Sequence, residues 1–112
     1  MNTTDTPLAV MEIRDGEEIL TTLVTPHIPQ VGIYKLLAKK KTDRTIEWAH
    51  FVQRDSGLKE KVIRGTVATR AELDTVITVI NDNLRKVFGV TMQAAEYDIR
   101  MLDGTKVSET VH

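Results

Sequence analysis

His50 is the residue for which the sequence offers the clearest chemistry. In the segment 45–54, Ile46, Trp48, His50 and Val52 alternate onto one face of a predicted strand. Ala49 and Phe51 fall on the other face, and a strand with apolar groups on both faces is central in its sheet. A partly buried imidazole there could act as a general base or contact a ligand. The same pattern fits a core histidine whose ring nitrogens bind neighbouring groups, and no G-x-S-x-G motif supplies a nucleophile.

His27 is the second candidate for a pocket residue. It lies in the segment TPHIP (25–29), where prolines on both sides would hold it rigidly, although a loop histidine is also commonly exposed. The three histidines show no H-x-x-x-H spacing, and the chain has no cysteine. The isolated glycines form no phosphate-binding loop. We therefore expect no metal ion and no cofactor.

A basic hairpin tip is the most distinctive surface feature that the sequence predicts. Lys39, Lys40, Lys41 and Arg44 crowd this tip, and Tyr34 and Trp48 lie in the same strands. Single-stranded nucleic-acid binders combine cations for phosphates with rings that stack on bases. Lysines at a hairpin tip also protect an exposed strand edge from pairing with other chains. Both interpretations stay open at the level of sequence.

Composition narrows the class of protein. The chain has 112 residues, of which 41% are apolar and 28% charged, and its formal net charge is −1. That total hides a basic middle: residues 35–64 carry nine basic and four acidic side chains, between two acidic ends. No apolar run approaches the ~20 residues of a membrane-spanning helix. The polar start of the chain lacks the features of a secretory signal, so we expect a cytoplasmic protein that does not bind membranes.

The periodicity predicts strands in the first two thirds of the chain. Asp15-Gly16 between residues 8–14 and 17–24 is typical of a two-residue hairpin with a type I′ turn. A proline-containing connector (25–32) leads to strands at 33–41, 45–54 and 59–68, joined by short polar turns into an antiparallel meander. Gly65 interrupts the last of these strands, which suggests a bulge or a close approach by another backbone or by a ligand.

A helix and a final strand follow. Thr69 and Glu72 form a capping box, and an apolar stripe continues from Leu73 to Phe88, so the helix is predicted over 69–89, with Gly89 as its C-terminal stop. The last strand is predicted over 90–102. Its two faces differ: Ala95, Tyr97, Ile99 and Met101 share one, while Glu96, Asp98 and Arg100 share the other.

Together these elements predict an α+β domain: an antiparallel sheet of about five or six strands in a meander, with one long helix packed on one face. We expect a flexible leader (1–7), a single domain (8–102) and a flexible tail (103–112). One helix covers only part of such a sheet, and apolar groups such as Ala49 and Phe51 would then need a cover, for which a second copy of the chain is one candidate.

The favoured function is that of a small non-enzymatic protein that acts through protein–protein contacts, as a homo-oligomer or as an accessory subunit of a partner. The first alternative is single-stranded nucleic-acid binding by the basic hairpin with aromatic stacking. The second is an enzyme with His50 in a pocket.

Overall fold

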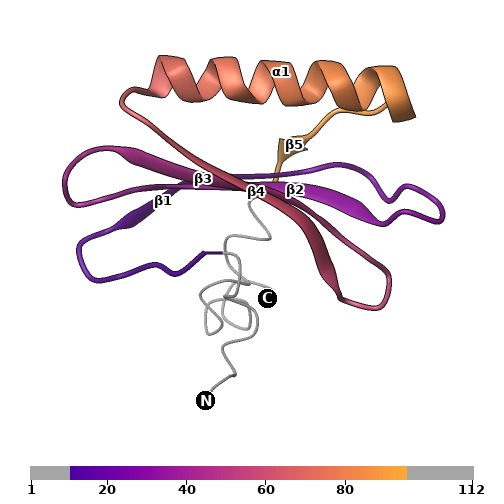
Figure 1. Ribbon diagram of the computed structural model, residues 1–112, viewed down its shortest axis with the longest axis horizontal. Coiled ribbons are helices and arrows are strands. Elements are labelled where there is room, and N and C mark those ends of the chain that lie inside the picture. Colours follow the sequence, from indigo (N-terminus) through magenta and orange to yellow (C-terminus); the bar gives the residue numbers. More distant parts are fainter. Residues whose placement is uncertain (1–10, 96–112) are drawn as a thin grey trace, which may run out of the picture.

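A computed structural model describes residues 11–95 of the chain (Figure 1). Its elements are β1 (Glu18–Val24), β2 (Ile33–Lys40), β3 (Ile46–Gln53), β4 (Lys59–Val67), α1 (Arg70–Phe88) and β5 (Gln93–Ala94). All neighbouring strands are antiparallel, and their order in the five-stranded sheet is β4-β3-β2-β1-β5. The helix lies across one face of the sheet. The predicted α+β fold, a meander sheet with one long helix, is confirmed.

The start and the end of α1 follow from local side-chain chemistry. The Thr69 hydroxyl accepts a hydrogen bond from the Glu72 backbone N–H at 3.2 Å, and the Glu72 carboxylate accepts one from the Thr69 N–H at 3.2 Å. At the other end Gly89 adopts the left-handed conformation, with φ of 74°, and its N–H donates to the Arg85 carbonyl. These reciprocal bonds satisfy backbone groups that have no partner within the helix.

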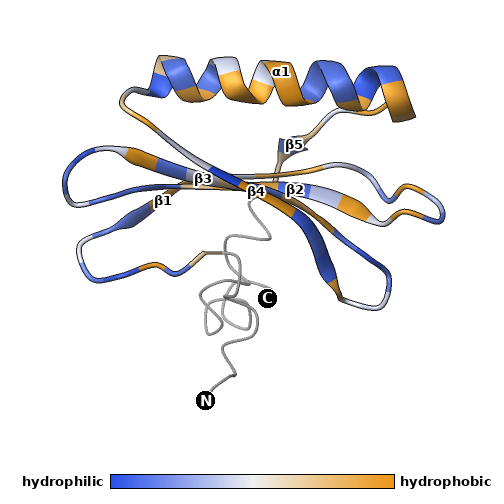
Figure 2. Ribbon diagram, viewed as in Figure 1, coloured by the Kyte–Doolittle hydropathy of each residue, from blue (hydrophilic) through white to orange (hydrophobic). Residues whose placement is uncertain are grey.

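The main core lies between α1 and the sheet. Leu36 and Ala38 of β2 and Ile46 of β3 pack there with Leu73 and Leu84 of α1. In Figure 2 the strands carry both hydrophobic and hydrophilic residues, and successive side chains of a strand point to opposite faces of the sheet, so that one set faces the helix. Burying an aliphatic side chain of this size contributes roughly 1.5–3 kcal/mol, so this layer supplies most of the stability of the sheet–helix contact.

The predicted first hairpin is wrong. Asp15-Gly16 does form a turn, in which the Glu17 N–H donates to the Arg14 carbonyl at 3.0 Å. Only Gly16 has a positive φ, of 85°, whereas a type I′ turn needs positive φ at both central residues. A turn with positive φ at only one central residue does not match the twist of two paired strands, so the two segments that it joins diverge. Residues 11–14 consequently form no strand, and residues 8–10 lie outside the described part of the chain.

The segment that precedes this turn crosses the sheet face opposite the helix. Met11 is buried on the sheet face opposite the helix, where it packs against Ala49 and Phe51 of β3. We call residues 11–17 the strap. The expectation that a second copy might cover Ala49 and Phe51 is therefore not needed, because the strap belongs to the same chain and both side chains are already buried.

The close neighbour of Gly65 is a side chain, and not the backbone or ligand that the sequence suggested. A Cβ atom built on it would lie 2.6 Å from the Cζ2 atom of Trp48, so the indole ring lies directly against the glycine. The irregularity in β4 comes earlier, at Lys61, which has φ of 56° next to the shift in register between His50 and Val52. The glycine thus marks a close contact, but neither the kind of neighbour nor the position of the bulge was predicted.

The predicted last strand is described only at its start. Gln93 and Ala94 pair with Val24 and Leu23 of β1, and residues 96–102 lie outside the described part of the chain, as do the predicted leader (1–7) and tail (103–112). Within residues 11–95, no helix is both long and apolar enough to span a membrane.

Candidate interaction surface

β4 forms one edge of the sheet. Its inner side pairs with β3, and within residues 11–95 no strand pairs with its outer side. This edge faces the viewer in Figure 1, beneath α1. Ile63 is 56% exposed there and Val62 is 40% exposed. An edge strand with unpaired backbone groups and apolar side chains is a template for pairing with another chain.

Ile63 lies on the helix side of the sheet. It pairs with His50, whose ring stacks on Tyr34, and the Tyr34 ring contacts Phe88 of α1. Cross-strand partners point to the same face of a sheet. The exposed Ile63 side chain therefore borders the space between β4 and the helix.

One flank of α1 carries two more exposed valines. Val79 is 55% exposed and Val87 is 69% exposed. The Asn81 side chain marks the opposite flank, because its Oδ1 accepts a hydrogen bond at 2.9 Å from the backbone N–H of Met92, next to β5. With about 3.6 residues per turn, Val79 and Val87 point away from Asn81. The valines therefore lie on the half of α1 that faces away from β5. We call Ile63, Val79 and Val87 the apolar edge.

Part of β4 is protected against pairing. Lys61 forms the bulge, and the carboxylate of Glu60 accepts a hydrogen bond from the Arg54 Nε at 2.9 Å. Bulges and lysines are common ways to blunt an edge strand. The regular part of the edge that remains is residues 62–67, which include the exposed Val62 and Ile63.

His50 occupies a position in the core and not in an open pocket. The residue is 8% exposed, its Nδ1 donates to the backbone carbonyl of Lys35 at 3.0 Å, and its ring lies 5.5 Å from the Tyr34 ring in a stacked arrangement. Burial lowers the pKa of His50, and the hydrogen bond to the Lys35 carbonyl opposes this shift in part. These contacts correspond to the structural interpretation of a neutral imidazole.

His27 is exposed and lies in a different environment. Its Nε2 is 2.8 Å from a carboxylate oxygen of Asp55, and the two side chains are 53% and 70% exposed. The pair links the connector before β2 to the turn between β3 and β4. Within residues 11–95 no group of three or more His, Asp or Glu side chains could hold a metal ion.

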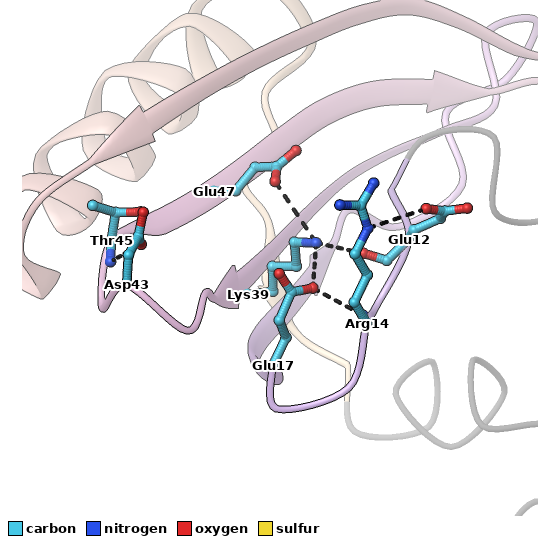
Figure 3. Close-up of polar contacts among 7 residues, drawn as sticks. All are labelled: Glu12, Arg14, Glu17, Lys39, Asp43, Thr45 and Glu47. Atoms are coloured by element: carbon cyan, nitrogen blue, oxygen red, sulfur yellow. Dashed lines mark hydrogen bonds and ion pairs between the residues drawn. The ribbon is translucent and has the colours of Figure 1, made fainter.

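The structure separates the predicted basic residues. Lys39 points to the face opposite the helix, where its Nζ donates to the Glu17 carboxylate at 2.6 Å and to the Glu12 carbonyl, with Glu47 at 3.7 Å (Figure 3). The side chains of Lys39 and Glu17 are 5% and 7% exposed. Lys40 and Arg44 are exposed, and Lys41 is half-buried. The ammonium of Lys39 is thus engaged inside the molecule and unavailable for a phosphate.

The aromatic members of the predicted set lie elsewhere. Tyr34 and Trp48 are half-buried against the helix-side core, whereas Lys39 is on the opposite face. The six residues proposed for nucleic-acid binding are therefore not brought together on one surface. Sequence reasoning missed the strap, because Lys39 and Glu17 are 22 positions apart and no local spacing connects them.

Comparison with family models, with curated proteins and with solved structures finds no match to this chain.

Proposed function

We propose that this protein acts by binding protein, and that it assembles with copies of itself through the apolar edge. The observation that carries the proposal is the exposure of Ile63 on the regular part of an edge strand. The exposed valines of α1, on the half of the helix away from β5, add further apolar surface that a partner could bury. Association is driven mainly by such burial of apolar surface.

The other surfaces support this choice. The strap already covers the sheet face opposite the helix, where Phe51 is 2% exposed. His50 has a backbone partner and a neutral ring, and the basic hairpin lacks an aromatic platform beside it. Among the described residues, the apolar edge is the surface where binding of a protein partner would bury exposed apolar side chains.

Sedimentation velocity of the full chain tests the proposal. We expect the wild type to sediment as a species larger than the 12.6 kDa monomer, with a concentration dependence. Ile63→Lys places a charge in the contact and should give a monomer. Ile13→Lys is the matched control, because Ile13 is 41% exposed but lies in the strap. It should behave as the wild type does. A wild type that stays monomeric at every concentration contradicts the proposal.

A further inference from the structure

The regular part of β4, with the residue that follows it, has the same order of polar and apolar residues in both directions from Gly65. The glycine is flanked on each side by one polar residue and then by two apolar ones, in the order Val62, Ile63, Arg64, Gly65, Thr66, Val67 and Ala68. An isologous contact between two copies of a chain requires a surface that is complementary to itself. A strand with this pattern meets that requirement when it pairs with the same strand of a second copy that runs in the opposite direction.

The side chains of Ile63 and Val67 lie on the helix side of the sheet. Their partners in β3 are His50 and Ile46, and Ile46 belongs to the main core. When Gly65 pairs with Gly65 of a second copy, Ile63 of each copy lies opposite Val67 of the other. Residues directly opposite each other in an antiparallel pair have Cβ atoms about 4.5–5.5 Å apart. The contact therefore covers Ile63, which is 56% exposed in the single chain.

The bulge at Lys61 favours this register over its neighbours. With the two-fold axis at Gly65, residues 63–67 of each copy pair, and Lys61 lies beyond the end of the other copy's β4, which ends at Val67. An axis one or two residues nearer the bulge places Lys61 opposite the other copy's β4, where the bulge interrupts the pairing. An axis one residue nearer the helix leaves Ile63 beyond the end of the opposite strand. The axis at Gly65 avoids both.

Trp48 provides a second observation at the same position. Its indole ring lies over Gly65, where a Cβ atom would be 2.6 Å from Cζ2, and the residue is half-buried. The glycine thus lets the ring of Trp48, from the neighbouring strand β3, reach the edge strand on the helix side. An axis at Gly65 brings the Trp48 rings of the two copies next to each other, and aromatic side chains at the centre of an interface stabilise it.

We propose that two copies of the chain pair through β4 in antiparallel orientation, about a two-fold axis that passes through Gly65 at right angles to the sheet. This inference rests on the proposed function and adds the register of the contact and the place of Trp48 in it. The two five-stranded sheets then form one continuous sheet, with both copies of α1 on the same face.

Disulfide cross-linking of the full chain tests the register. The sequence has no cysteine, so Ile63→Cys and Val67→Cys each introduce a single thiol. A disulfide needs Cα atoms about 4.4–6.8 Å apart, which residues directly opposite each other satisfy. The two copies of Ile63, by contrast, are four positions apart along the strands, or about 13 Å. On oxidation, a mixture of the two variants should therefore give a disulfide-linked dimer, whereas neither variant alone should.

Fluorescence tests the place of Trp48, because it is the one tryptophan of the chain. Association should remove its ring from water, so the emission maximum of the wild type should move to shorter wavelength as the protein concentration rises. Ile63→Lys, which should stay monomeric, should show no such shift. An emission maximum that does not change while the wild type assembles would place the contact away from Gly65 and overturn the inference.

The cross-linking outcomes separate the two proposals. A disulfide-linked dimer of Ile63→Cys alone shows an axis at residue 63, and assembly without any disulfide in the mixture shows another contact. Either result overturns this inference and leaves self-association intact, whereas a wild type that stays monomeric overturns both. Circular dichroism checks that each variant is folded. If either is not, Arg64→Cys and Thr66→Cys replace the pair, because the same register places these residues opposite each other.

Discussion

At the scale of single residues, burial decides the chemistry of the two most conspicuous titratable groups. Burial of the His50 ring lowers its pKa and favours the neutral form, although the hydrogen bond that the ring donates to the Lys35 carbonyl opposes this shift in part. The Lys39 side chain is buried, and its Nζ donates to the Glu17 carboxylate and to the Glu12 carbonyl. Hydrogen bonding to Lys39 lowers the pKa of Glu17. His50 and Lys39 both make their contacts within the folded chain.

The lowered pKa of His50 predicts a pH dependence of stability. The unfolded chain binds a proton near pH 6.5, whereas the folded protein resists protonation. The free energy of unfolding should therefore have its highest value above pH 6.5. It should decrease as the pH falls from 6.5 toward the lower pKa of His50 in the folded protein. The midpoint of urea unfolding measures this, and His50→Gln should remove the decline in that window.

The carboxylates of Glu17 and Asp43 have lowered pKa values, so their contribution to stability is lost only as the pH falls below the ordinary carboxyl range.

Nuclear magnetic resonance gives an independent check on the same group. The ring protons of His50 should titrate with a midpoint below 6.5 in the folded protein. A midpoint at or above that value would show an open, solvated ring and would return His50 to the list of candidate catalytic residues.

At the scale of elements, the two central hairpins use the same turn with different residues. In the β2–β3 turn the Arg44 N–H donates to the Lys41 carbonyl at 2.9 Å, and in the β3–β4 turn the Gly57 N–H donates to the Arg54 carbonyl at 2.8 Å. Arg44 has φ of 74° and Gly57 has φ of 94°. The left-handed conformation costs a residue with a side chain about 1–2 kcal/mol, and glycine avoids this cost.

Exchanging the residues of these turns should change stability in opposite directions. Gly57→Arg should destabilise the protein by about 1 kcal/mol, because strain is added where a Cβ meets no neighbouring atom within 4 Å. Arg44→Gly should stabilise it by about 0.5 kcal/mol, since relief of strain exceeds the entropy cost of glycine. Urea unfolding of both variants measures the difference. Equal effects of the same sign would show that the two turns are not equivalent.

At the scale of the whole molecule, the sheet divides the charges that the sequence places close together. The ammonium of Lys39 is buried beneath the strap, while Lys40 and Arg44 remain at the hairpin tip beside Asp43. The formal net charge is −1, so no global field attracts a polyanion. What remains exposed is a small basic tip without an aromatic platform.

This division predicts weak binding to nucleic acid. Labelled single-stranded DNA or RNA should show no saturable increase in fluorescence anisotropy in the micromolar range, even at low salt. Arg44→Gly, which removes a cation from the tip, serves as the matched variant. Binding that weakens steeply with salt, and that is reduced in this variant, would contradict the prediction and restore the basic hairpin as a phosphate-binding site.

Local patterns in the sequence determined the elements whose interactions are local. The capping box of α1 joins Thr69 to Glu72, the turn of Gly57 joins neighbouring residues, and the alternation around His50 assigns its face, so each could be predicted without the fold. A close approach at Gly65 was also indicated, because glycine inside a strand has few other roles, but its neighbour, the Trp48 side chain, was not predicted.

The tertiary structure alone decided the features that depend on distant residues. Whether residues 11–14 extend the sheet or cross beneath it depends on competition with β2 and β5 for the edges of β1. The burial of Lys39 depends on Glu17 across the strap, and the exposure of Ile63 depends on β4 being an edge. Spacing along the chain does not encode strand order, because the order is set by the packing free energy of the whole sheet and helix.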